Sequence, residues 1–208
     1  MDNDDYRRGR LTNHKVYGEG IAILAGDALL NYAFELMLED TLKSGLNMAD
    51  KVEAMQYIAK SSGVAGMIGG QIVDMESEGK KISVDTLKYM HKCKTGALLK
   101  APIISAAIIC GANEGEINNL TTFAEKIGLS FQIKDDILDV EGDLETMGKN
   151  CGSDAFNEKT TYVTAYGVTG AKKILQEVTN EAINAVGSFG TKADFLKSLA
   201  EYIANRKN

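Results

Sequence analysis

The sequence predicts an all-α protein, built as a single bundle of long helices. Apolar residues recur every three or four positions through most of the 208-residue chain, which is the period of an amphipathic helix. No segment shows the alternation of apolar and polar residues that is typical of a strand. No internal repeat, low-complexity segment or interdomain linker divides the chain, so residues 1–208 are expected to form one domain.

The N-terminal half is expected to contain two long helices. The first spans about residues 18–43 and ends where Ser44 and Gly45 interrupt the apolar pattern. The second begins near Ala49 and runs to about Gly79. Four glycines inside it lower its helix propensity: Gly63, Gly66, Gly69 and Gly70. Such glycines are useful where two helices approach closely or where a ligand presses on the backbone.

The C-terminal half is expected to contain four helices. An apolar helix follows Lys94 and reaches about Gly111, with a kink expected at Pro102. The next helix occupies about residues 115–140. A segment over residues 141–158 has the Gly, Asn and Ser density of a loop. Helices over residues 161–186 and 192–205 complete the bundle.

Composition disfavours several functional classes. The formal net charge of −6 argues against nucleic acid as a general partner. The longest apolar runs are interrupted by Gly, Asp or Lys, so no transmembrane span is expected, and no charged-then-apolar signal segment opens the chain. The three cysteines are widely spaced and form no metal-binding pattern, which predicts reduced thiols in a cytoplasmic protein.

The segment over residues 131–139 contains the strongest chemical signal. Asp135 and Asp139 lie one helical turn apart, with Asp136 beside them and Gln132 one turn earlier on the same face. Like charges on one face repel, and a divalent cation would offset this repulsion. Carboxylate oxygens without His or Cys suit Mg²⁺, or alternatively Mn²⁺, which shares its ligand shell with substrate phosphates. An acidic, solvated helix face is the alternative, but the surrounding apolar residues favour an embedded segment.

Two other clusters could complete a site for metal and phosphate. Asp2 and its acidic neighbours precede Arg7 and Arg8, which indicates either a disordered charged terminus or a second acidic cluster beside phosphate-binding arginines. Lys94 and Thr95 supply a cation and a hydroxyl before an apolar helix, a combination that suits an anion, although a solvated lysine is a serious alternative.

Further polar residues could line the same site. Gln71 and Asp74 share one face of a predicted helix, either as a polar helix end or as a wall of the cavity. Lys149 lies in the loop after the aspartates and Lys159 directly follows it, where a metal-bound phosphate would need positive charge.

With these motifs in place, the sequence closely resembles the trans-polyprenyl diphosphate synthases, and among them the bacterial farnesyl diphosphate synthases (geranyltranstransferases). The matching segments are residues 1–9, 24–29, 70–71 with 74, 94–96, 131–132, 135–139, 148–149, 159–162 and 199–203 with Arg206. Each motif alone is weak, but their order and spacing together are highly specific.

The resemblance implies a helical bundle of the isoprenoid synthase type and a head-to-tail prenyl transfer. An allylic diphosphate, dimethylallyl or geranyl, would condense with isopentenyl diphosphate to give farnesyl diphosphate. Mg²⁺ between two aspartate clusters would assist ionisation of the allylic substrate, and an apolar cavity would keep water from the carbocation. The family is typically homodimeric, so a homodimer is implied as well.

The resemblance also assigns roles to individual residues. Metal would be bound by Asp135 and Asp139 in the second cluster and by Asp2 in the first. The catalytic set would be Asp135, Asp136, Asp139, Lys94 and Lys159. The substrate-binding set would be Arg7, Arg8, Gln71, Lys94, Thr95, Gln132, Lys149 and Lys159.

The sequence departs from the family pattern at its beginning. The first aspartate motif of the family starts with an Asp-Asp pair before the position of Asp2, and neither this pair nor the preceding helices has a counterpart here. We therefore expect an N-terminally truncated chain that is a weak or inactive synthase by itself and that exposes apolar faces. The alternatives are a related terpene cyclase, which ionises the same substrate without a second diphosphate site, and a non-catalytic fragment or partner subunit.

Overall fold

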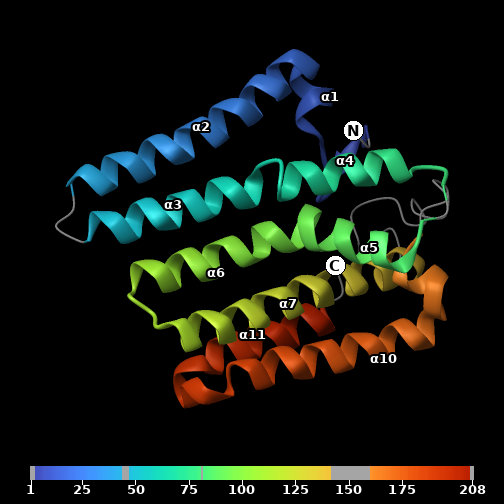
Figure 1. Ribbon diagram of the computed structural model, residues 1–208. Helices are drawn as coiled ribbons and strands as arrows, with labels where there is room; N and C mark the ends of the chain where they lie inside the picture. The colour runs from blue at the N-terminus through green and yellow to red at the C-terminus, as the bar shows by residue number, and fades with distance from the viewer. Residues whose placement is uncertain (1–2, 44–46, 81, 142–159, 207–208) are drawn as a thin grey trace.

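The computed structural model describes residues 3–43, 47–80, 82–141 and 160–206, and it is all-α apart from one small hairpin (Figure 1). In chain order the elements are β1 (Tyr6–Arg7), β2 (Arg10–Leu11), α1 (Asn13–Tyr17), α2 (Glu19–Lys43), α3 (Met48–Ser62), α4 (Met67–Ser77), α5 (Val84–His91), a π-helical turn η1 (Lys92–Gly96), α6 (Ala97–Ile109), α7 (Glu114–Glu141), α10 (Tyr162–Ala185), a 3₁₀ segment η2 (Gly187–Ala193) and α11 (Asp194–Asn205). The expected helical class is confirmed.

Helix α7 is the centre of the bundle. It contacts α6 and η1 on one side and α10 and α11 on the other. Helix α3 packs against α6, while α2 lies at the outer edge of the bundle and contacts α1 and α3 (Figure 1). The aspartate-bearing segment therefore lies on a helix with neighbours on several sides, as its apolar flanks predicted.

Two apolar clusters form the core, and α7 contributes to both. The first contains Leu87, Met90, Ile133, Ile137, Tyr162, Ala171, Leu175 and Val178. The second contains Phe123, Ile127, Ala182, Val186, Ala193, Ala200 and Ile203. Fully burying a side chain such as Phe or Ile contributes about 1.5–3 kcal/mol, so the two clusters fix α7 along its length against α5, α10 and α11.

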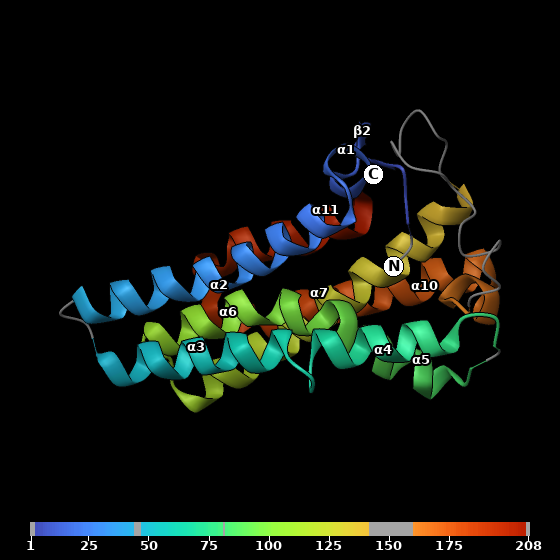
Figure 2. The same ribbon diagram turned by 90° about the horizontal axis from the view of Figure 1, so that it is seen from above.

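The helix expected over residues 49–79 is two helices. Helix α3 ends at Ser62 with Gly63 as its C-cap, and α4 begins at Met67. A Cβ atom on Gly66 would lie 2.1 Å from the carbonyl oxygen of Ser61, so only glycine fits this tight connection. The break is visible in both ribbon views (Figures 1 and 2). The prediction of one continuous helix was wrong because the glycines permit a turn as well as a close approach.

The expectation that the chain has no strands was also wrong, by one short hairpin. Strands β1 and β2 pair antiparallel, with Tyr6 opposite Leu11 and Arg7 opposite Arg10. The two turn residues, Arg8 and Gly9, have φ values of 52° and 72°. Positive φ at both turn positions is the geometry that suits a two-residue hairpin, and strands of two residues leave no alternation for sequence analysis to detect.

Helix α6 continues across Pro102. A change of helical geometry occurs earlier, at the π-helical turn η1, which carries Lys94 and Thr95. Single π-helical turns inside longer helices often occur at functional sites. The sequence predicted a kink at Pro102, because proline is a recognised local signal for a kink, whereas a π-helical turn has no comparable signal in the sequence.

Helix α2 is largely exposed. Its length and its hydropathy of 1.5 reach the values of a membrane-spanning segment, and none of that apolar window is buried. No transmembrane span was expected from the sequence, and α2 is a weak candidate for one by length and composition only. Length and composition alone do not establish a span, because core helices of soluble proteins reach the same values.

Candidate active site

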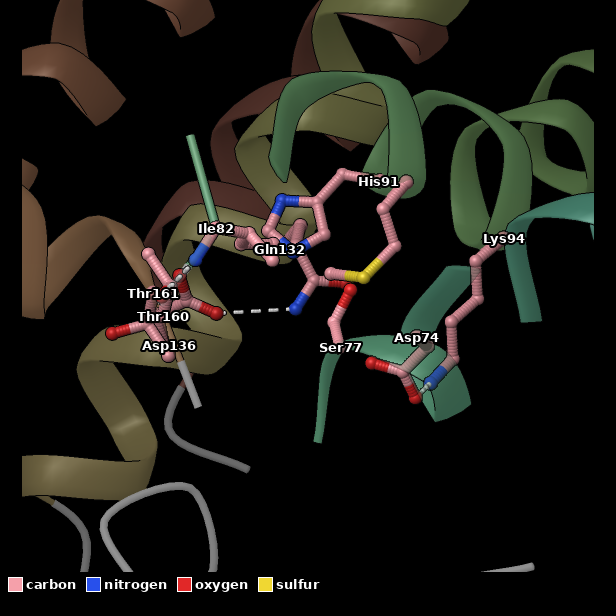
Figure 3. Close-up of a pocket in the computed structure, with 10 residues that line it drawn as sticks. Asp74, Ser77, Ile82, His91, Lys94, Gln132, Asp136, Thr160 and Thr161 are labelled. Carbon is pink, nitrogen blue, oxygen red and sulfur yellow. Dashed lines mark hydrogen bonds and ion pairs between the residues drawn. The ribbon is translucent and has the colours of Figure 1, made fainter. Parts of the chain in front are cut away.

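A small cavity of about 80 Å³ lies among α4, α5, α7 and the start of α10 (Figure 3). Its walls are mostly polar. They comprise Asp74, Ser77, Ile82, Met90, His91, Lys94, Gln132, Asp136, Thr160 and Thr161. Four of these residues, Asp74, Lys94, Gln132 and Asp136, were singled out from the sequence, and the fold brings them together from α4, η1 and α7.

Lys94 is held in the cavity by Asp74. Its Nζ donates to Asp74 Oδ2 at 2.6 Å, and Asp74 is only 5% exposed. The close approach of α4 to η1 that permits this pair depends on Gly70, where a Cβ atom would lie 2.2 Å from the backbone nitrogen of Lys94. Gln71 follows on α4 and is half-buried. The expected close helix contact at the glycine cluster is therefore confirmed at this position.

A chain of hydrogen bonds links η1, α7 and α10. The Thr95 hydroxyl donates to Gln132 Oε1 at 3.3 Å, and Gln132 Nε2 donates to Asp136 Oδ1 at 3.1 Å. The other carboxylate oxygen of Asp136 accepts from the backbone nitrogen of Tyr162 at 2.7 Å. Tyr162 is the first residue of α10, so this carboxylate also interacts favourably with a helix N-terminus. Asp136 is 2% exposed and binds α10 to α7.

His91 was missed by the sequence analysis. It is 8% exposed, lines the cavity, and stacks on Tyr162 with ring centroids 5.8 Å apart. Burial, with a smaller contribution from the Lys94 charge, lowers the pKa of His91 to about 4 against the opposing effect of Asp74. The imidazole is therefore neutral at pH 7. Its position could have indicated a site residue, because residues three apart on a helix are neighbours and His91 precedes Lys94 by three.

Two buried polar atoms on the stacked rings of His91 and Tyr162 have unused hydrogen-bonding capacity. Neither His91 Nδ1 nor the Tyr162 hydroxyl has a hydrogen-bond partner within the described ranges. Burial raises the pKa of Tyr162 to about 12, with smaller contributions from Tyr166 and Asp136. Both groups are therefore neutral at physiological pH, and both can interact with a polar ligand or water in this region.

The three aspartates of α7 have different surroundings. Asp135 is partly exposed, and its Oδ1 accepts from Arg206 Nη2 at 2.5 Å. Asp136 faces the start of α10, and Asp139 is 6% exposed. No group of three or more His, Cys, Asp or Glu side chains is arranged to hold a metal ion within the part of the chain that the structure describes. The interpretation of all three aspartates as one shared helix face is therefore too simple, since Asp136 has a structural role.

The donor chemistry on α7 nevertheless fits a magnesium ion. Mg²⁺ needs only one or two carboxylates when phosphates and water complete its octahedral shell. Asp135 offers a carboxylate at the protein surface, with 29% of its side chain exposed. Asp139 follows one turn later. One carboxylate ligand from α7 is therefore compatible with a magnesium ion whose other ligands are phosphate and water oxygens.

Other predicted site residues are on the N-terminal hairpin or outside the described residues. Arg7 and Arg8 are exposed on the hairpin, and neither lines the cavity. Asp2, Lys149 and Lys159 lie outside the described residues.

The family model described as polyprenyl synthetase matches residues 1–198. The chain belongs to the polyprenyl synthetase family. A farnesyl diphosphate synthase of Micrococcus luteus is 45% identical over 99% of this chain and 69% of its own length. A geranylgeranyl diphosphate synthase of Cyanophora paradoxa is 44% identical over 100% of this chain and 69% of its own length. The sequence resemblance to the family is thereby confirmed.

Solved polyprenyl synthetases share the fold. An FPP/GFPP synthase from Zymomonas mobilis superposes with a TM-score of 0.86 at 35% identity, covering 98% of this chain and 68% of that one. A geranyltransferase from Helicobacter pylori, solved with magnesium and isoprenyl diphosphate, gives a TM-score of 0.82 at 32% identity. The match covers 99% of this chain and 66% of that one. The chain thus spans about two thirds of the length of these polyprenyl synthetases.

Proposed function

We propose that the protein is a cytoplasmic prenyltransferase that condenses an allylic diphosphate, dimethylallyl or geranyl, with isopentenyl diphosphate to form farnesyl diphosphate. The observation that carries the proposal is the meeting of Lys94, Thr95 and Gln132 beside the aspartate turn of α7. A cation, a hydroxyl and an amide at one place provide the donors that a diphosphate requires.

Lys94 is the principal diphosphate ligand in this proposal. An ammonium group has three N–H donors, and Asp74 accepts one of them at 2.6 Å. The other two can donate to oxygens of the leaving diphosphate. Because Asp74 fixes the ammonium beforehand, little reorganisation is needed as negative charge develops on the departing group. Lys149, Lys159, Arg7 and Arg8 would add positive charge around the two diphosphates, and Gln71 would line the allylic site.

Asp135 and Asp139, with Asp2 in the first cluster, would hold Mg²⁺ or Mn²⁺, which neutralises diphosphate charge and makes it a better leaving group. Asp136 joins α7 to the start of α10 through the Tyr162 amide, and Gln132 holds the other oxygen of the same carboxylate. An apolar cavity between the helices would supply the water-excluding surroundings that a carbocation requires.

Binding of magnesium diphosphate to variants of Asp135 tests the metal site. Asp135→Ala removes the proposed ligand, so Mg²⁺-dependent binding of inorganic diphosphate, measured by calorimetry, should be lost. The matched control is Asp194→Ala, because Asp194 also forms an ion pair with a basic side chain, at 3.1 Å from Lys197. The control should bind like the wild type. Unchanged binding by Asp135→Ala would show that this carboxylate is only a surface feature.

Incorporation of labelled isopentenyl diphosphate tests the reaction and its product. With geranyl diphosphate and Mg²⁺, the expected product is farnesyl diphosphate. Absence of labelled product would contradict the proposed condensation. A product of twenty carbons would assign the protein to the geranylgeranyl type, which the relatives also include.

A non-catalytic role as a partner subunit is the second candidate. It is favoured by the pairing of Asp135 with Arg206, which engages the proposed metal ligand. Such a subunit would bind diphosphate weakly and support no turnover at any Mg²⁺ concentration, whereas a terpene cyclase would consume the allylic diphosphate without isopentenyl diphosphate.

A further inference from the structure

The C-terminal arginine occupies the carboxylate that the proposed function assigns to metal. Arg206 Nη2 donates to Asp135 Oδ1 at 2.5 Å and to the backbone oxygen of Phe131 at 3.2 Å. Its guanidinium carbon lies 4.2 Å from the centroid of the Phe131 ring. Phe131 and Asp135 are one turn apart on α7, so the guanidinium lies along that turn and contacts it at three points.

This contact is built into the fold. Ile203 and Ala200 anchor α11 in the second core cluster, together with Phe123 and Ile127 of α7. Arg206 follows the last residue of α11, and its side chain is 10% exposed. The packing of α11 therefore delivers one cation to one carboxylate, although 71 residues separate the two in the sequence.

We propose that Arg206 is an internal competitor of the metal ion for Asp135. Resting on the proposed function, this inference concerns how the same site exchanges one cation for another. Mg²⁺ binds carboxylate oxygens at about 2.1 Å, and a guanidinium hydrogen-bonded to the same oxygen would place two positive charges within a few ångströms of each other. Arg206 therefore holds Asp135 in the metal-free chain, and binding of metal with diphosphate displaces it.

The surroundings of Arg206 support an exchange of cations at this position. Lys134, the neighbour of Asp135 in the sequence, adds a second basic side chain to the turn of α7 that Arg206 contacts. Positive charge is thus already concentrated at this turn of α7. Adding a metal ion without moving Arg206 would increase the repulsion, whereas exchanging the two keeps the local charge nearly balanced.

Calorimetry with inorganic diphosphate tests the competition. In Arg206→Gln the guanidinium charge is removed, so the apparent affinity for Mg²⁺ should rise roughly fivefold or more, which corresponds to about 1 kcal/mol. The matched control is Lys197→Gln, which removes the same charge from α11 but breaks the ion pair with Asp194. It should change the affinity less than twofold. The gain in Arg206→Gln should shrink at high ionic strength.

Hydrogen exchange gives a readout that does not depend on catalysis. In the wild type, magnesium diphosphate should increase amide exchange in the peptide covering residues 199–206, because the contact with α7 is lost. In Arg206→Gln this peptide should exchange rapidly with or without the ligand. In Asp135→Asn it should exchange rapidly without metal. Circular dichroism of each variant checks that the bundle remains folded.

The outcomes separate this inference from the proposed function. If Asp135→Asn loses Mg²⁺ binding but Arg206→Gln binds no more tightly than the wild type, Arg206 does not compete, and only this inference fails. If Asp135→Asn binds Mg²⁺ as the wild type does, the proposed metal site itself is wrong. If neither the wild type nor Arg206→Gln binds magnesium diphosphate, both are rejected.

Discussion

Neighbouring carboxylates on α7 have different roles because each faces a different part of the bundle. Asp136 is buried and accepts hydrogen bonds from Gln132 and from the first amide of α10. Asp135, the preceding residue, is partly exposed and pairs with Arg206. A helix rotates successive side chains by about 100°, so adjacent aspartates cannot share one environment. We therefore assign Asp136 to the architecture of the site and Asp135 to its chemistry.

The neutral state of His91 predicts a specific dependence of stability on pH. Its pKa is about 4 in the folded chain and about 6.5 in a free side chain. As pH falls from about 6.5 to 4, the unfolded chain takes up a proton that the folded chain does not. The free energy of unfolding should therefore decrease by about 3 kcal/mol over this range and remain constant above it with respect to this group.

Urea denaturation of the wild type and of His91→Gln measures this contribution. Glutamine does not titrate, so the difference between the two proteins should be constant above pH 7 and should change as the pH falls towards 4. Subtracting the free energy of unfolding of the variant from that of the wild type also removes the contribution of Glu125. Burial raises the pKa of Glu125, but Lys100 and other lysines lower it overall. A difference independent of pH would show that His91 is solvated in the folded chain.

At the scale of elements, the contact between α4 and η1 decides the geometry of the cavity. Gly70 lets the backbone of α4 approach that of η1 so closely that Asp74 reaches Lys94. Helix propensity alone would favour alanine over glycine by about 1 kcal/mol. The glycine therefore has a positional function, which is to permit this contact.

Gly70→Ala should destabilise the protein, because the new Cβ atom would lie 2.2 Å from the backbone nitrogen of Lys94. Overpacking of this kind costs about 1–3 kcal/mol, and the displaced η1 should also weaken diphosphate binding. Gly26→Ala on α2 is the matched control, since nothing lies within 4 Å of its Cβ position. The control should be neutral or slightly stabilising in thermal unfolding. Equal effects of the two substitutions would show that the helices separate readily.

At the scale of the whole molecule, the apolar surface of α2 is the feature that the described fold leaves uncovered. Large side chains such as Leu24, Leu29 and Leu30 are 63%, 72% and 54% exposed. Exposed apolar patches of this extent typically mark an interface. We propose that α2 lies in the contact between two copies of a homodimer.

Leu29→Glu should weaken self-association of the chain. Burying one leucine contributes roughly 2 kcal/mol, so the dissociation constant from sedimentation velocity should rise more than tenfold. Asn31→Glu introduces the same charge at an exposed polar position of α2 and is the control. A monomeric wild type at all concentrations would rule out α2 as a dimer contact in this chain.

The sequence by itself determined the helical class and most helix boundaries, and it predicted the residues of the proposed diphosphate site, because apolar periodicity and short motifs act over a few residues. The tertiary structure alone decided that α3 and α4 are separate, that Asp136 supports α10, and that His91 lines the cavity. It also decided that Asp74 holds Lys94 and that Arg206 pairs with Asp135. These contacts join residues 20 and 71 positions apart in the chain. Their geometry depends on helix packing, and local sequence patterns contain no measure of that packing.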